Sequence, residues 1–334
     1  MKRYDDTVIM DVMRRWLHRN FNWLLSVSLV LLALLILLPQ INAFQRCFTI
    51  VRGAAHFAIL GATMTVTATF FIAAANYHIL ARRPLLYRRT FLVAVANMFT
   101  SRLLPAGAGS IATFFIYLRH RRHTVGQASG VIAVNNFLGF FSHVCLLLVV
   151  VMVSPTSLQG LRLPNVQPAI IAAIGATVLV GLAILLFQQT WRRRVRLIER
   201  SLARDLRFYK KYPLRLGGAF SLSILLTLAN AATLWYCVLA VHTVISPVVA
   251  LAVFTVGIVI GTITPTPGGL GGTEAGLLAG LVSYHVAADR ALATVILYRL
   301  VSYWLTLAIG GLTYIYVDRR GYLHSLRQAT VKTA

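Results

Sequence analysis

Long apolar segments alternate with short basic loops along most of the chain. A helix that crosses about 30 Å of hydrocarbon needs about 20 mostly apolar residues. Six segments meet this requirement, and we predict spans at about 21–39, 53–80, 125–153, 168–188, 214–241 and 291–317. Proline and glycine interrupt two further apolar segments, 91–118 and 248–286. The pattern therefore predicts an all-α fold, that of a polytopic integral membrane protein with six full spans and two broken hairpins.

The two interrupted segments are predicted to be re-entrant, so that each enters and leaves the membrane on one side. The halves Phe91–Leu104 and Ser110–Leu118 are each too short to cross the hydrocarbon as straight helices. Backbone opened at membrane depth must face protein or a wet cavity. The alternative interpretation is a pair of kinked structural helices. The predicted breaks are Pro105, Gly107 and Gly109 in the first segment and Pro265, Pro267, Gly268, Gly269 and Gly271 in the second.

The distribution of lysine and arginine agrees with re-entrant hairpins, because these residues favour the cytoplasmic side. Basic residues are dense in 81–90, 119–124 and 190–215, whereas 154–167 contains only Arg162. With both hairpins re-entrant, every basic-rich loop falls on one side, and both termini are then cytoplasmic in a bacterial plasma (inner) membrane. We therefore interpret the net charge of +24 as an orientation signal. No nucleic-acid recognition module accompanies it, so no nucleic acid is expected as a partner.

The predicted elements divide the chain into a basic N-terminal segment (1–20), a transmembrane domain (21–317) and a basic tail (318–334). The halves 21–153 and 168–317 each contain two spans, a broken hairpin and a further span, but they start on opposite sides. This order predicts an inverted-topology repeat. In such repeats, interrupted helices at matching positions indicate a transport site near the midplane of the membrane.

Composition excludes most other classes of protein. Hydrophobic residues make up 58% of the chain and charged residues 12%, with a mean hydropathy of +0.75. A soluble domain would carry about 25% charged residues. The three cysteines lack the spacing of a disulfide framework or metal site, and no catalytic motif is present. We therefore expect no metal, no cofactor and no enzymatic activity.

Three charged residues are predicted at membrane depth, namely Arg102, Glu274 and Arg299. Glu274 should lie in the first turn of the half-helix after the second break, where the helix dipole favours a carboxylate. One interpretation is a buried ion pair of Glu274 with Arg299 that fixes the hairpin. The other is that Arg102 and Arg299 present positive charge to a phosphate, since guanidinium donors suit phosphate oxygens. The ion-pair interpretation and the phosphate-binding interpretation do not exclude each other. Among the asparagines at depth, Asn97 is the best candidate for lining a cavity.

Three motifs resemble those of the lysylphosphatidylglycerol synthase transmembrane domain family. Residues 267–275 resemble its signature Pro-Gly-Gly-x-Gly-x-x-Glu-Ala. Residues 297–304, together with Gly310, are similar to the last-helix pattern of that family. Asn97 followed by residues 104–109 resembles its first broken hairpin.

The resemblance implies a flippase-like membrane protein, a stand-alone member that lacks the soluble synthase domain. It implies translocation of an anionic phospholipid or lipid-linked precursor between leaflets. The substrate-binding residues expected on this basis and from charge at depth are Arg102, Glu274, Arg299, Asn97 and Tyr298. The alternatives are a non-catalytic scaffold or regulatory partner of a lipid-handling machine and, less well supported, a lipid-headgroup enzyme. A homo-oligomer or a lipid-handling membrane partner also stays open.

The chain departs from the pattern of that family in its first half. Many relatives carry a Glu-Arg pair where this sequence has Val134, Asn135 and Asn136. The first hairpin of relatives usually continues with Gly-Glu or Gly-Asp, whereas here Ser110 follows Gly109. Both differences remove charge from the expected cavity.

Overall fold

The structure is a computed structural model that describes residues 49, 51–104, 107–153, 208–209, 211–264 and 266–323. The chain divides into two units, Met1–Arg52 and Gly53–Ala334, and the following description concerns the second unit. The predicted spans 21–39 and 168–188, the segment 1–20, most of the tail, and the breaks at Pro105 and Pro265 lie outside the described residues.

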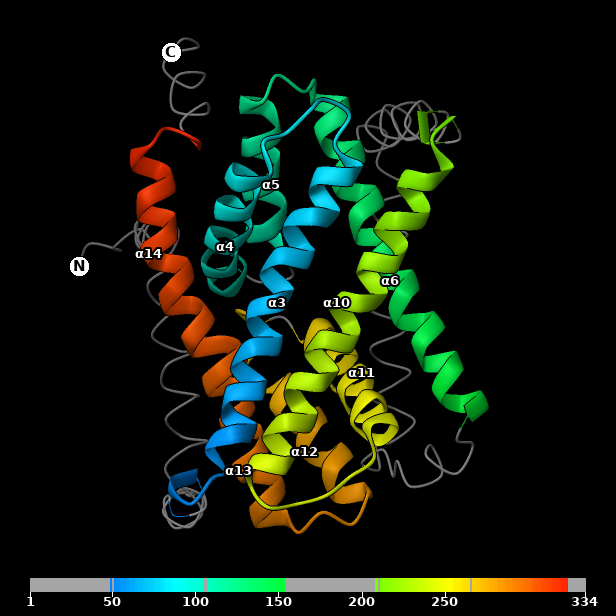
Figure 1. Cartoon of the computed structure of the whole chain (residues 1–334), viewed down its shortest axis with the longest axis vertical. Coiled ribbons are helices and arrows are strands. Elements are labelled where there is room, and N and C mark those ends of the chain that lie inside the picture. Colours follow the sequence, from blue (N-terminus) through cyan, green and yellow to red (C-terminus); the bar gives the residue numbers. More distant parts are fainter. Residues whose placement is uncertain are drawn as a thin grey trace, which may run out of the picture. The chain divides into compact units, whose positions relative to one another are not determined.

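The described part of this unit is built from helices (Figure 1). They are α3 (His56–Leu80), α4 (Tyr87–Leu103), α5 (Ala108–His120), α6 (Val125–Val153), α10 (Pro213–Ala240), α11 (Pro247–Ile263), α12 (Gly272–Ser283), α13 (Ala288–Arg299), the π-helix η2 (Leu300–Leu305) and α14 (Thr306–Arg319).

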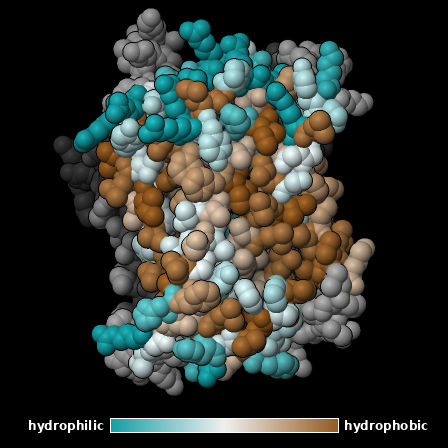
Figure 2. All heavy atoms as spheres, in the orientation of Figure 1, coloured by the Kyte–Doolittle hydropathy of each residue, from teal (hydrophilic) through white to brown (hydrophobic). Residues whose placement is uncertain are grey.

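Four of the predicted spans are present as helices long and apolar enough to cross a membrane. These stretches are His56–Leu80, Val125–Val150, Pro213–Ala240 and Ala288–Arg319. Apolar side chains gather between the two more polar ends on the face shown in Figure 2. The all-helical fold and the membrane-spanning character predicted from the sequence are thus confirmed for the described residues.

Each interrupted segment forms two packed helices. The segment 91–118 contains α4 and α5, and 248–286 contains α11 and α12. In the first pair the hydroxyl groups of Thr100 and Thr113 lie 2.7 Å apart. A side chain at Gly109 would collide with the carbonyl of Thr100, so glycine is required for this close approach. The two breaks predicted from proline and glycine are therefore real interruptions of the helices.

Some helices begin earlier than the sequence predicts. The first arm of the first hairpin starts at Tyr87 instead of residue 91, and the last long helix starts at Ala288 instead of residue 291. The added residues include Arg88 and Asp289. A hydropathy pattern excludes such polar residues, but the first turn of a helix accommodates them because it extends beyond the apolar region.

The contacts between helices repeat when the two halves are exchanged. In this exchange, α3 corresponds to α10, α4 to α11, α5 to α12, and α6 to α13–α14. The contact between α4 and α14 then corresponds to the contact between α11 and α6. The pairs α3–α4 and α5–α6 likewise have the counterparts α10–α11 and α12–α13, and α3 packs along α10. In Figure 1, α3 and α10 run in opposite directions, as do α6 and α14.

The basic loops meet at one end of this unit. Arg215 donates to the carbonyl of Ala81 at 3.2 Å, and the N–H of Arg83 donates to Nε2 of His123 at 3.2 Å. Arg89 lies over the ring of Tyr322, which follows α14. The arginines of these loops and adjoining helix ends are Arg82, Arg83, Arg88, Arg89, Arg119, Arg121, Arg122, Arg215, Arg319 and Arg320.

Candidate functional site

The second break places a carboxylate at the start of α12. Gly271 is the N-cap of this helix, with a φ of 85°, and Glu274 is its third residue. Oε2 of Glu274 accepts a hydrogen bond from the N–H of Gly271 at 2.7 Å. The first N–H groups of a helix lack partners within it and attract negative charge, so this carboxylate stabilises the helix start. The predicted position of Glu274 in the first turn is confirmed.

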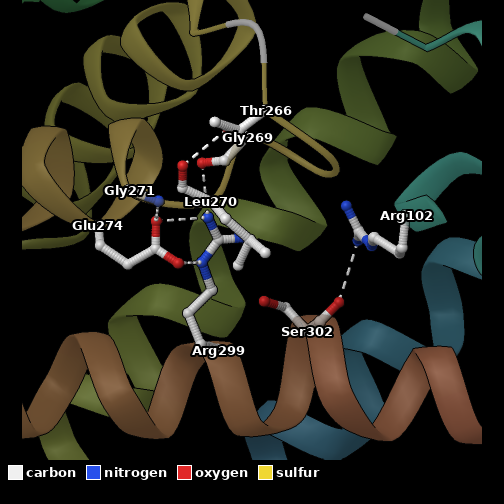
Figure 3. Close-up of polar contacts among 8 residues, drawn as sticks. All are labelled: Arg102, Thr266, Gly269, Leu270, Gly271, Glu274, Arg299 and Ser302. Atoms are coloured by element: carbon white, nitrogen blue, oxygen red, sulfur yellow. Dashed lines mark hydrogen bonds and ion pairs between the residues drawn. The ribbon is translucent and has the colours of Figure 1, made fainter. Parts of the chain in front are cut away.

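Glu274 also forms an ion pair with Arg299, the last residue of α13. Nη2 of Arg299 donates to Oε2 at 2.9 Å, and its Nε lies 2.7 Å from Oε1. The same Nη2 donates to the carbonyl of Gly269 at 3.2 Å, so both the break and α12 hold Arg299 (Figure 3). The side chains are 10% and 29% exposed for Arg299 and Glu274 respectively. The ion pair inferred as one interpretation of the sequence is therefore present.

Arg102 reaches the same region from the first hairpin. Its Nη2 donates to the carbonyl of Ser302 at 3.0 Å, as Figure 3 shows. Its Nε is buried and has no hydrogen-bond partner within the described ranges. No carboxylate of the described residues pairs with this guanidinium group. Arg102 therefore brings to the site a positive charge that no acid among the described residues balances.

The ring of Tyr303 joins the two arginines. The guanidinium carbons of Arg102 and Arg299 each lie 5.4 Å from the ring centroid, within the range of cation–π attraction. The two cations repel each other electrostatically. Because Glu274 supplies one negative charge against two positive charges, this cluster has a net charge of +1. We call Arg102, Glu274, Arg299 and Tyr303 the charged cluster.

A glycine and a π-helix shape the wall of the charged cluster. Gly268 has a φ of +60°, and a Cβ there would lie 2.5 Å from the Tyr303 ring and 3.4 Å from Cδ of Arg102. Only glycine fits this backbone conformation and this contact without strain. Ser302 and Tyr303 lie in η2, where the helix widens directly after Arg299. Single π-helical turns within α-helices are frequent at functional sites.

Other residues predicted for the site lie nearby or in the first hairpin. Tyr298 is buried in α13 and packs edge-on against Phe254. Asn97 is buried in α4, where its Oδ1 accepts from Thr100 at 3.5 Å, and none of its hydrogen bonds reaches the charged cluster. Gly107 is the N-cap of α5. Among the described residues, no three His, Cys, Asp or Glu side chains gather as metal ligands would.

Sequence reasoning did not assign a role to Ser302 or Tyr303. Tyr303 follows Arg299 by four residues, and that spacing brings side chains together on a helix surface, so a signal for it was present. The carbonyl of Ser302 accepts from Arg102 and from the hydroxyl of Thr306 at 2.8 Å. The sequence does not reveal a backbone acceptor of this kind, because every residue carries a carbonyl group.

Residues 23–310 match the model of the family described as the lysylphosphatidylglycerol synthase TM region. The chain belongs to this family. The match includes the charged cluster and both interrupted segments, and the resemblance inferred from the motifs is thereby confirmed. A search of curated proteins finds no match for this chain. Membership in this family indicates a membrane protein with a lipid-related function.

Proposed function

We propose that the protein moves an anionic phospholipid or lipid-linked precursor between the two leaflets and binds its phosphate at the charged cluster. The observation that carries this proposal is the excess of positive charge on two arginines from different halves of the chain. Charge at membrane depth is costly and marks substrate pathways. A bound phosphate would neutralise the excess, which explains why a second acid is not needed there.

The contacts of the two arginines suit them for different parts of this task. Arg299 is oriented by Glu274 and by the carbonyl of Gly269, so its guanidinium plane is fixed before a ligand arrives. Among the described residues, Arg102 is held through its Nη2, and its Nε has no hydrogen-bond partner. Guanidinium groups bind phosphate oxygens through two parallel N–H bonds. In this proposal Arg299 is the fixed contact and Arg102 the adjustable one.

We further infer that both interrupted segments are re-entrant and belong to an inverted-topology repeat. Two observations support this inference, the exchange symmetry of the helix contacts and the opposite directions of corresponding helices (Figure 1). The clustering of arginines at one end of the unit agrees with a cytoplasmic location of that end. We propose that both termini also lie on the cytoplasmic side of a bacterial inner membrane. Rocking of one half against the other would then expose the site alternately to each leaflet.

The proposed cycle contains no covalent step, and so it needs neither a catalytic residue nor a cofactor. Anionic phospholipids are its expected partners, and no nucleic acid takes part. The competing function is that of a scaffold or regulatory partner of a lipid-handling machine. In that case the charged cluster would only hold the hairpin in place.

Reconstitution separates these two functions. The full chain is reconstituted in zwitterionic vesicles that carry a fluorescently labelled phosphatidylglycerol in one leaflet. Movement of this lipid to the other leaflet is measured as the label becomes accessible to a quencher. We expect Arg102→Gln and Tyr303→Leu to slow this movement about tenfold or more. Arg88→Gln is the matched control, because Arg88 is exposed at the basic end of α4. Equal rates for wild type and Arg102→Gln, or rates no higher than those of empty vesicles, would overturn the transport proposal.

A further inference from the structure

The first hairpin contains an uncharged counterpart of the charged cluster. Helix α5 follows the N-cap Gly107, whose φ is 70°, and Ser110 is its third residue. Helix α12 follows the N-cap Gly271, whose φ is 85°, and Glu274 is its third residue. The exchange of halves that relates the helix contacts therefore pairs Ser110 with Glu274.

The partner of Glu274 has a counterpart as well. Arg299 is the twelfth residue of α13, which starts at Ala288, and Asn136 is the twelfth residue of α6, which starts at Val125. At the corresponding positions, the second half has the ion pair of Glu274 and Arg299, whereas the first half has Ser110 and Asn136.

Hydrogen bonds connect these residues into one polar chain. The side chains of Ser110 and Tyr77 are hydrogen-bonded to each other. Nδ2 of Asn135 donates to the Tyr77 hydroxyl and to Oδ1 of Asn136, each at 3.3 Å. Tyr77 is buried, whereas Asn136 is exposed. The chain Ser110, Tyr77, Asn135 and Asn136, which we call the amide cluster, therefore runs from the interior to an accessible surface.

Within the part of the chain that the structure describes, the amide donors of Asn136 have no protein acceptor. Its Oδ1 accepts from Asn135, but no residue within the described ranges accepts from its Nδ2. Asn136 lies about 17 Å along the axis of α6 from the first residue of that helix, close to the middle of the span. An unsatisfied amide in hydrocarbon costs several kcal/mol, so this amide favours contact with a polar group.

We propose that the amide cluster binds the hydroxyl groups of a polyol, such as glycerol or a sugar, in the headgroup of the transported lipid. This inference rests on the proposed function. Amide and hydroxyl groups both donate and accept hydrogen bonds, and so they match the hydroxyl groups of a polyol, which also do both. Arg102 and Ser110 flank the same break, one on each arm of the hairpin. In this proposal, the polyol esterified to a phosphate at Arg102 lies on the Ser110 side of this break.

The experiment compares two anionic lipids that differ in hydroxyl groups. Native mass spectrometry of the detergent-solubilised full chain measures the affinities of phosphatidylglycerol and phosphatidylmethanol, and their ratio is the result. We expect wild type to prefer phosphatidylglycerol about three- to tenfold, as one or two hydrogen bonds predict. Asn136→Ala should bring the ratio close to one. Asn230→Ala is the matched control, because the Asn230 amide donates to the carbonyl of Leu226 in its own helix.

The outcomes also distinguish this inference from the proposed function. Equal affinities of the two lipids in wild type, or an unchanged ratio in Asn136→Ala, would overturn the polyol site. If Arg102→Gln still weakened both lipids in that case, phosphate binding would stand. If neither lipid bound wild type more tightly than Arg102→Gln, phosphate binding would fail and the polyol site with it.

Discussion

Glu274 connects Arg299 to the first turn of α12 through one carboxylate. Its Oε2 accepts both from Nη2 of Arg299 at 2.9 Å and from the N–H of Gly271 at 2.7 Å. The first bond crosses between helices, and the second caps the helix to which Glu274 belongs. The ion pair and the start of α12 are therefore coupled, and substitutions at this position can separate the two contributions.

Glu274→Gln and Glu274→Ala should destabilise the protein by different amounts. Loss of one partner of a buried ion pair costs about 3–5 kcal/mol, and we expect the lower part of this range because Glu274 is 29% exposed. Glutamine still accepts from the Gly271 N–H, whereas alanine does not. The alanine variant should therefore lose about 1 kcal/mol more. Thermal unfolding of the detergent-solubilised protein measures both values.

The charge-swapped variant Glu274→Arg with Arg299→Glu is the control for this prediction. It restores an ion pair but not the acceptor for the Gly271 N–H. Recovery of part of the stability lost in the single variants is thus expected. No recovery at all would argue against the ion pair as a stabilising contact.

Gly268→Ala should be much more harmful than alanine at another glycine of positive φ. The added Cβ meets the Tyr303 ring at 2.5 Å, and overpacking of this kind costs about 1–3 kcal/mol beyond the backbone strain. Gly321 has a φ of +74° with open space around it, so Gly321→Ala isolates the backbone cost. The difference between the two thermal midpoints, and the lipid-movement rate of each variant, measure the contribution of the Gly268–Tyr303 contact. Equal effects would contradict this packing.

The sequence predicts the charged residues of the site better than the uncharged ones that complete it. Glu274 could be placed because glycines break the helix directly before it, and Arg299 because an arginine in an apolar span needs a partner. Tyr303 was not assigned a role, although its spacing of four residues from Arg299 predicts that the two side chains lie close together. The carbonyl of Ser302 is available through the local π-helical geometry, which the hydropathy pattern does not encode.

His123 should make stability dependent on pH at the basic end. Burial lowers the pKa of His123 below its ordinary value, and the positive charges of Arg83 and Arg121 add to this effect, against hydrogen bonds that raise it. The neutral ring accepts from the N–H of Arg83 at 3.2 Å, and its Nδ1 lies 3.1 Å from the carbonyl of Leu118.

Because the folded state binds a proton less readily, stability is complete above about pH 6.5 and decreases as pH falls below this value. The thermal midpoint between pH 7 and pH 5 tests this expectation. In His123→Gln the amide keeps a donor and an acceptor but does not titrate, so the midpoint should decrease less over the same range. His120, whose pKa is also lowered by burial, leaves a residual slope in this variant. An identical pH dependence in wild type and His123→Gln would exclude His123 as the source.

Ser110→Glu combined with Asn136→Arg should create a second ion pair if the two halves correspond as inferred. Each single variant places an unpaired charge at membrane depth and should lower the thermal midpoint. The double variant should recover part of that loss, because the new pair would occupy the positions that Glu274 and Arg299 hold in the other half. A double-mutant cycle measures the coupling free energy, which we expect to be about 1–3 kcal/mol for residues in contact. Combining Ser110→Glu with Gln127→Arg, about two and a half turns from Asn136 toward the start of α6, provides the control. A coupling no greater than that of this control would show that Ser110 and Asn136 do not face each other and would remove the basis of the correspondence.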